Sequence, residues 1–127
     1  ADQKTLYIAE GEPDHEHVRE LRAYPIDGDG SLGNHSVLHT FGADHRGPQR
    51  GIEGMCLDAD GNIVACGGWA KNGPGPLIYV FSPAGRLLKT YDLLADMPNR
   101  CAFGGPDMAT LYVTTATGEL LAGKAAG

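Results

Sequence analysis

The stretch GIEGMCLDADGNIVACGG, residues 51–68, carries the clearest structural signal in the chain. A short apolar run at residues 55–57 ends at the turn cluster 58–62, and a second apolar run, 63–66, begins directly after it. Two short apolar runs joined by a turn rich in Asp, Gly and Asn predict a β-hairpin. Glu53 precedes the first run and is therefore expected where that strand begins.

The same hairpin pattern recurs along the chain. The runs that begin at Leu6, Ile63 and Leu111 each follow a turn containing an aspartate, and they start 57 residues (6 to 63) and 48 residues (63 to 111) apart. A second pair of runs starts at Leu38 and Leu88, 50 residues apart (38 to 88). A period near 50 residues made of four short strands is typical of β-propeller blades, whose small sheets bury their faces against one another. The sequence therefore predicts an all-β chain that is part of a β-propeller, in preference to a β-sandwich with unrelated hairpins.

The predicted strands divide the chain into three blades. Residues 1–45 form a blade that lacks its first strand, residues 46–96 form a complete blade, and residues 97–127 form an incomplete one. The strands of the complete blade are expected near residues 53–58, 62–68, 77–82 and 87–92. About two and a half blades cannot close a ring. We therefore expect either that the chain is a fragment of a longer polypeptide or that copies associate through their open blade edges.

Composition argues against two classes of partner and bears on the compartment. The formal net charge of −6 and the lack of a basic stripe argue against nucleic-acid binding. The sequence has no run of about 18 apolar residues, so no membrane partner is expected.

The three cysteines form no CxxC pair and fall in predicted strands, where we expect them to be buried. An odd number of such thiols favours a reducing, cytoplasmic location over a disulfide framework, with secretion or a periplasmic location left open.

Two short motifs suggest metal binding and have simpler explanations. The segment His15-Glu16-His17 places two imidazoles at the spacing of half a zinc site, although a solvated loop is the more common setting for such a segment. Residues 27–31, DGDGS, begin like a calcium loop, but Leu38 stands at the twelfth position, where an EF-hand has glutamate. A turn between two strands is the better interpretation of that segment. The sequence also has no Gly-x-Ser-x-Gly elbow, which disfavours a serine hydrolase.

Two longer motifs resemble those of one known family. The pattern P-D-G-M-x-x-D-x-x-G is matched at residues 52–55, Asp58 and Gly61, and the pattern C-x-F-G-G with a later L-Y-V-T is matched at residues 101–105 and 111–114. The run at 78–99 is similar as well. On these motifs the chain resembles the SMP-30/gluconolactonase/luciferin-regenerating family from Asp2 to about Gly118.

The resemblance implies a six-bladed propeller that hydrolyses lactones, often sugar lactones, with one divalent cation (Ca²⁺, Mg²⁺, Mn²⁺ or Zn²⁺) in its central channel. Of the three metal-binding residues in the family pattern, only the last falls on this chain, at Glu53, where the family has aspartate. Glutamate keeps a hard carboxylate ligand but adds one methylene, which shifts where a cation would sit. The family's Asn-Gly pair and its earlier glutamate would both precede Ala1. We therefore expect no lactone hydrolysis by these 127 residues alone.

Four residues are candidates for the site. Glu53 is expected to bind the cation and to act as general base toward water, with a solvated loop carboxylate as the alternative. Arg100 is expected beside it, because internal symmetry places both residues immediately before a strand at the channel mouth. There Arg100 would bind a carbonyl oxygen or sugar hydroxyl of the lactone, or else pair with a loop carboxylate such as Asp96. Asn99 and Glu10 are further substrate-binding candidates. A propeller that binds a partner or a small ligand without catalysis is the alternative function.

Overall fold

The computed structural model describes residues 3–11 and 18–124, and every regular element in these two ranges is a β-strand. The prediction of an all-β chain is confirmed. No helix in the described ranges is long and apolar enough to cross a membrane.

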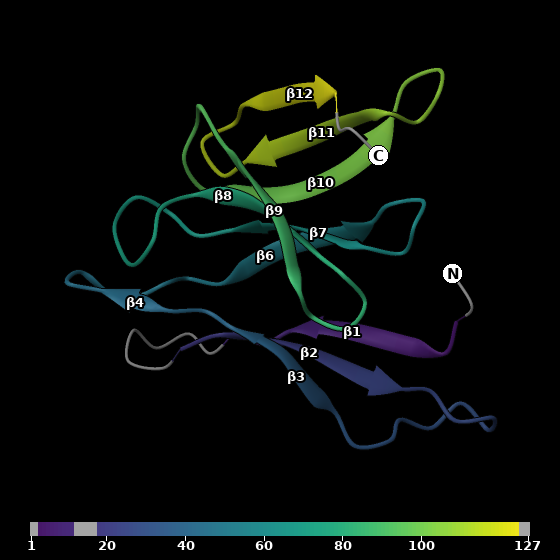
Figure 1. The fold of residues 1–127 in the computed structure, drawn as a ribbon. Helices are drawn as coiled ribbons and strands as arrows, with labels where there is room; N and C mark the ends of the chain where they lie inside the picture. The colour runs from purple at the N-terminus through teal and green to yellow at the C-terminus, as the bar shows by residue number, and fades with distance from the viewer. Residues whose placement is uncertain (1–2, 12–17, 125–127) are drawn as a thin grey trace.

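Three antiparallel sheets and one small hairpin make up the fold (Figure 1). The first sheet contains β1 (Thr5–Ala9), β2 (Glu20–Pro25) and β3 (Ser36–Thr40). The middle sheet contains β6 (Ile52–Leu57), β7 (Ile63–Gly67), β8 (Leu77–Phe81) and β9 (Leu87–Asp92). The third sheet contains β10 (Pro98–Gly104), β11 (Thr110–Thr115) and β12 (Leu120–Lys124). The small hairpin contains β4 (Ala43–Asp44) and β5 (Gly47–Pro48).

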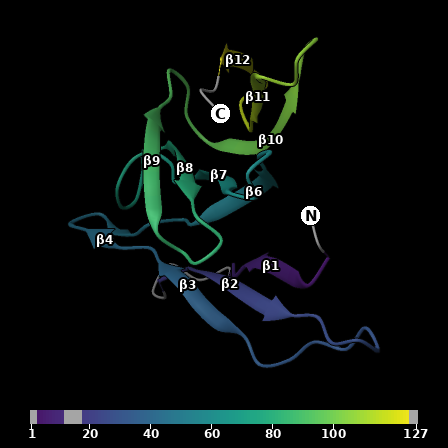
Figure 2. The same cartoon turned by 45° about the vertical axis from the view of Figure 1, so that its right-hand side comes forward.

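The three sheets are stacked, with the middle sheet between the other two (Figures 1 and 2). In each sheet, neighbours in sequence are neighbours in space, so the strands form a simple meander. We propose that each sheet corresponds to one blade of the predicted division into residues 1–45, 46–96 and 97–127. In the described ranges β1 and β12 each pair on one side only, and self-association through these edges stays a prediction.

The predicted turn at residues 58–62 is built by one aspartate. Asp58 Oδ1 accepts hydrogen bonds from the amides of Asp60 and Asn62, both at 2.9 Å, and its Oδ2 accepts one from Asn62 Nδ2 at 3.0 Å. Gly61 has a φ of 82°, in the left-handed region that glycine adopts without steric cost. A side chain that bonds the amides following it pre-forms a turn. The DADGN cluster therefore sets the register of β6 against β7.

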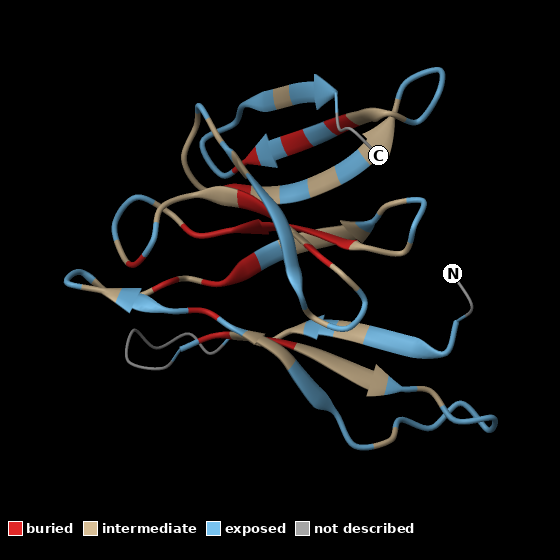
Figure 3. Cartoon of the chain, viewed as in Figure 1, coloured by how far each residue is buried: buried red, intermediate tan, exposed pale blue. Residues whose placement is uncertain are grey.

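Two hydrophobic clusters hold the sheets together, one on each face of the middle sheet. Figure 3 shows that buried residues are concentrated in and next to the middle sheet. The buried members of the first cluster, between the first and middle sheets, are Leu21, Phe41, Ile52, Ile63, Ala65, Tyr79 and Phe81. Those of the second, between the middle and third sheets, are Val64, Cys66, Ile78, Leu111 and Val113. Residues of β7 alternate between the two clusters, because successive side chains of a strand point to opposite faces. This explains why β7 is buried along its whole length.

The small β4–β5 hairpin was not predicted from the sequence. Its two-residue strands are too short for apolar alternation to appear. The hairpin is fastened to the loop after β7: Asp44 Oδ1 accepts from the amide of Gly73 at 3.1 Å, and Arg46 Nη2 donates to the carbonyl of Gly73 at 2.6 Å. Hydrogen bonds from Arg46 lower the pKa of Asp44 below its usual range.

One buried hydrogen bond leads to a stability prediction. Gln49 is 2% exposed, and its Nε2 donates to the Tyr79 hydroxyl at 2.6 Å and to the carbonyl of Pro74 at 3.2 Å. Tyr79→Phe is expected to lower the free energy of unfolding by about 1–2 kcal/mol, because the buried amide loses an acceptor. Urea unfolding measures the change. Tyr112→Phe, at a side chain that is 38% exposed, is the matched control and should change stability little; equal effects of the two variants would refute the prediction.

Candidate functional site

The first strand of the middle sheet has an extra residue near its start. Ile52 pairs with Gly67, and Gly54 pairs with Cys66, which is adjacent to Gly67 in β7. Glu53, between Ile52 and Gly54, therefore has no partner residue of its own in β7. One extra residue in one strand of an antiparallel pair is a β-bulge, which re-aims the side chain that it carries. Glu53 is the second residue of β6 rather than a residue just before it, and the bulge is what sets its side chain apart from the sheet.

The first strand of the third sheet has the same irregularity at the same place. Pro98 pairs with Thr115 and Arg100 pairs with Thr114, so that Asn99 is skipped. Both predicted residues of this strand, Asn99 and Arg100, therefore lie inside β10. The two bulges occur one residue after the start of β6 and one residue after the start of β10.

The bulges correct the symmetry argument made from the sequence. Counting residues back from the strands that begin near Ile63 and Leu111 matched Glu53 with Arg100. The pairing registers instead match Glu53 with Asn99, and they match Gly54 with Arg100. The error is one residue. It arose because β10 has one more paired residue than β6 between its bulge and its turn, although the two turns, residues 58–62 and 105–109, are equally long. Arg100 remains next to Glu53 for a different reason, which its contacts show.

Arg100 is anchored to the backbone beside Glu53. Its Nη1 donates to the carbonyl of Glu53 at 2.8 Å and to the carbonyl of Asn99 at 2.7 Å. The side-chain Oδ1 of Asn99 accepts from the Thr114 hydroxyl at 2.7 Å. The structure thus brings Glu53, Asn99 and Arg100 together, and their roles stay a prediction. Asp96 accepts instead from the amides of Ala70 and Met97, at 2.8 and 2.9 Å.

The carboxylate of Glu53 is held by an arginine that sequence reasoning missed. Arg50 Nη2 lies 2.9 Å from Glu53 Oε1, and the side chains of Arg50 and Glu53 are 25% and 35% exposed. The Arg50 guanidinium also lies over the Trp69 ring, 5.3 Å from its centroid, and Lys71 Nζ lies at the same distance from that ring. An arginine three residues before Glu53 was visible in the sequence, but only the fold shows that the intervening chain brings the two side chains together.

Two buried donors near Glu53, one on Arg50 and one on Trp69, have no hydrogen-bond acceptor among the described residues. They are Arg50 Nη1 and Trp69 Nε1. Unsatisfied buried donors are costly, and they are found at sites that bind a ligand or an ordered water. Together with the exposed carboxylate of Glu53, they make this end of β6 the candidate functional site.

The remaining sequence candidates lie elsewhere. Glu10 follows β1, where its amide donates to the carbonyl of Glu20 at 2.9 Å, and its role stays a prediction. The segment His15-Glu16-His17 lies outside the described residues. The DGDGS segment forms the expected turn, in which the Ser31 hydroxyl donates to Asp27 Oδ2 at 3.3 Å and to Asp29 Oδ1 at 2.6 Å.

The described residues do not form a metal centre by themselves. In residues 3–11 and 18–124, no group of three or more His, Cys, Asp or Glu side chains is placed to hold a metal ion. Glu53 offers one carboxylate, and that carboxylate is already paired with Arg50. A cation bound by Glu53 would need ligands besides this one carboxylate, whose Oε1 is paired with Arg50.

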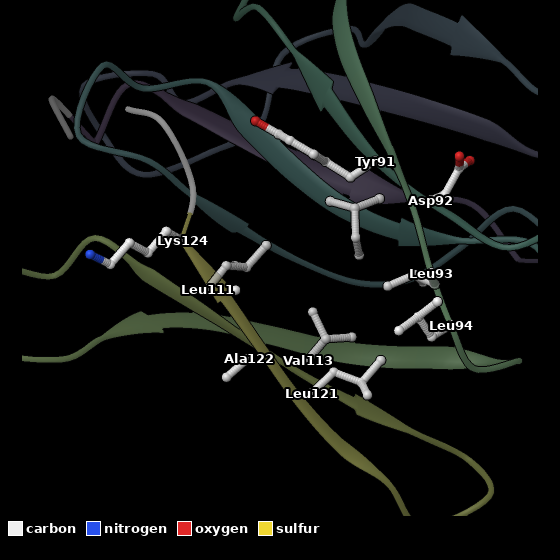
Figure 4. A pocket seen from close by; sticks show the side chains of 11 residues that line it. Tyr91, Asp92, Leu93, Leu94, Leu111, Val113, Leu121, Ala122 and Lys124 are labelled. Atoms are coloured by element: carbon white, nitrogen blue, oxygen red, sulfur yellow. The ribbon is translucent and has the colours of Figure 1, made fainter.

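An apolar cavity lies away from Glu53, between the middle and third sheets (Figure 4). Its volume is about 290 Å³. Leu93, which follows β9, faces Leu111, Val113 and Leu121 of the third sheet. Leu94 is fully exposed at the rim, where the charged ends of Asp92 and Lys124 turn outward. The leucines that face one another present no charged group for chemistry, so we interpret the cavity as a gap in inter-sheet packing.

Comparisons with known proteins find one matching family model and several similar sequences. The family model described as SMP-30/Gluconolactonase/LRE-like region matches residues 1–117. Regucalcin of Xenopus laevis is 33% identical over 119 residues, which is 91% of this chain and 34% of that protein. The 6-deoxy-6-sulfogluconolactonase of Pseudomonas putida is 33% identical over 95 residues, covering 75% of this chain and 30% of that protein.

A solved structure of luciferin-regenerating enzyme shares the fold. It superposes with a TM-score of 0.68 and 28% sequence identity, over 91% of this chain and 34% of that chain. The prediction of a β-propeller fold is thereby confirmed. The chain spans about a third of the length of these relatives.

Proposed function

Because the chain belongs to the SMP-30/gluconolactonase/LRE-like family, we propose that the full-length protein containing it hydrolyses lactones, and that Glu53 is the carboxylate this part of the chain contributes to the reaction. One observation carries the proposal. The bulge in β6 presents Glu53 beside Arg50, Asn99 and Arg100, at the position where the family motif has its metal-binding aspartate.

The residues present suit the proton transfer in ring opening. Water must lose a proton as it attacks the lactone carbonyl, and the half-exposed Glu53 carboxylate can accept that proton. Negative charge develops on the carbonyl oxygen, and arginine N–H groups stabilise such an oxygen. Arg100, held by two backbone carbonyls, is preorganised for this role. The ring C–O bond then breaks, the leaving alkoxide takes up the proton that Glu53 accepted, and the product is a hydroxy acid.

A divalent cation is the second part of the proposal. Ca²⁺, Mg²⁺, Mn²⁺ or Zn²⁺ would supply Lewis-acid chemistry when bound. The described residues do not hold such an ion by themselves, so we derive no step from it. If a cation binds in the full-length protein, its ligation by Glu53 competes with the Arg50 ion pair. The isolated 127-residue chain is still expected to show no turnover.

Glu53→Gln tests the assignment in the full-length protein. With glucono-1,5-lactone as substrate, a pH-stat records the acid released on ring opening. Loss of the proton acceptor is expected to lower kcat/KM by about 100-fold or more. Asp60→Asn, in the turn at the far end of the same strand, is the matched control and should leave turnover within about twofold.

Two outcomes would contradict the proposal. Wild-type turnover by the Glu53→Gln protein would show that Glu53 takes no part in catalysis. Binding of gluconolactone without hydrolysis by the wild-type protein, in the presence of each of the four cations, would favour the alternative of a non-catalytic binding propeller.

A further inference from the structure

All three cysteines lie at the interface between the middle and third sheets. Cys56 is on β6, Cys66 on β7 and Cys101 on β10. The Sγ atoms of Cys56 and Cys101 are 3.6 Å apart, and Cys101 Sγ also lies 3.5 Å from the carbonyl oxygen of Val64. The sequence led us to expect three buried thiols, but only Cys66 is fully buried, whereas Cys56 and Cys101 are partly exposed.

A close approach of the two strands explains the short sulfur–sulfur distance. A Cβ atom built on Gly54 would lie only 2.3 Å from the carbonyl oxygen of Asn99, so β6 and β10 touch at their backbones. Cys56 follows Gly54 by two residues, and Cys101 follows Asn99 by two residues. Because side chains on one face of a strand recur every two residues, the same faces meet again at the two thiols.

The two thiols come from faces that point toward each other. Cys56 and Cys101 both pack against the cluster that joins the middle and third sheets. Met55, one residue before Cys56, packs against the opposite cluster. A bond between the two sulfurs would therefore join neighbouring sheets, not two strands of one sheet.

We propose that Cys56 and Cys101 are an oxidation site at which a small-molecule disulfide converts the two thiols into a cross-link between the middle and third sheets. A disulfide bond is about 2.05 Å long, so the sulfurs must approach by about 1.5 Å, within reach of side-chain rotation. Cys66 is the neighbouring thiol that does not take part.

The chemistry balances with oxidised glutathione as the oxidant. One cysteine thiolate attacks a sulfur of oxidised glutathione, forms a mixed disulfide and releases one glutathione thiolate. The second cysteine thiolate attacks the protein sulfur of that mixed disulfide and releases the second glutathione. The two cysteines lose two protons and two electrons in total, and the glutathione disulfide is reduced to two thiols.

The surroundings make this cross-link slow to form near neutral pH. The hydrogen bond with the Cys101 thiol, followed by burial, raises the pKa of Cys56 well above the usual thiol range. The pKa of Cys101 is raised as well. Its hydrogen bond with Cys56 lowers that pKa, but the neighbouring Cys66 thiol and burial together raise it by more. The other titratable groups that act on the pair are Cys66 and Asp58. Because the thiolate is the reactive form, the rate should rise roughly tenfold from pH 7.5 to 8.5.

The experiment treats the 127-residue chain with oxidised glutathione at pH 8.5, blocks the remaining thiols with iodoacetamide, and maps the product by mass spectrometry. Before alkylation, we expect a loss of about 2 Da from the intact chain. After alkylation, we expect one peptide pair linked through Cys56 and Cys101, and an alkylated Cys66. Dithiothreitol should reverse the change. The oxidised chain should melt about 10 °C higher, because the cross-link restricts the unfolded chain.

Matched variants separate this site from general thiol reactivity. Cys56→Ser should abolish the cross-link, and Cys66→Ala should leave it intact. Stable glutathione adducts without a cross-link, or a link from Cys66 to either other cysteine, would overturn the proposal. Neither readout measures lactone hydrolysis, so this proposal and the proposed function can fail independently.

Discussion

Gly54→Ala is expected to lower the free energy of unfolding by about 3 kcal/mol, the upper end of the usual cost of overpacking. The added Cβ would lie 2.3 Å from the carbonyl oxygen of Asn99 and 3.2 Å from the Cα of Arg100. Real Cβ atoms do not approach a backbone oxygen that closely, so β6 and β10 would have to separate. Two strands that each belong to a sheet cannot move without disturbing the cluster between them.

Gly42→Ala provides the matched control for this measurement. A Cβ on Gly42 meets no atom within 4 Å, and its backbone is not left-handed. Urea denaturation of both variants should show a large loss for Gly54→Ala and little change for Gly42→Ala. If Gly54→Ala unfolds at the wild-type urea concentration, the two sheets do not pack as closely as described.

Phe81→Ala is expected to cost about 3–5 kcal/mol of stability, the usual range when a fully buried phenylalanine is truncated. Phe81 is 0% exposed. Its ring stacks on Tyr79 with centroids 5.9 Å apart, and it meets Phe41, which follows β3, edge-on at 6.4 Å. The His39 ring of β3 lies 4.8 Å away in a tilted arrangement. Truncation leaves a cavity between two sheets that share this aromatic packing, and neither sheet can close it alone.

The matched control for Phe81→Ala is Leu88→Ala, on the neighbouring strand β9. Leu88 is 46% exposed, so its truncation removes little buried surface. Thermal unfolding followed by circular dichroism should show a drop in Tm for Phe81→Ala at least three times that for Leu88→Ala. Similar shifts for the two variants would show that the aromatic cluster does not stabilise the contact between the first and middle sheets.

The strands were predictable because each is bounded by turn residues whose chemistry is local. The expected strand near 87–92 is β9 (Leu87–Asp92), and the expected hairpin around residues 58–62 is the turn that Asp58 builds. Turn formation depends on side chains and backbone within about five residues, which the sequence displays directly.

The detailed arrangement of the site was less predictable, for a physical reason. A β-bulge changes which residues pair across a sheet but leaves the composition of each strand unchanged. Counting residues matched Glu53 with Arg100, although the registers match it with Asn99, because β10 has one more paired residue than β6 between its bulge and its turn. The Arg50–Glu53 ion pair depends on how the chain enters β6, which no local pattern records.

The bulges at Glu53 and Asn99 also bear on how such a protein can change its chemistry during evolution. Neither residue occupies a paired position in its sheet. A substitution at either position leaves the strand register intact, although it loses the Arg50–Glu53 ion pair or the Thr114–Asn99 hydrogen bond. If the other blades of the ring carry the same irregularity, each contributes one position that lies outside the strand pairing. Substrate preference could then diverge by single replacements while the scaffold stays constant.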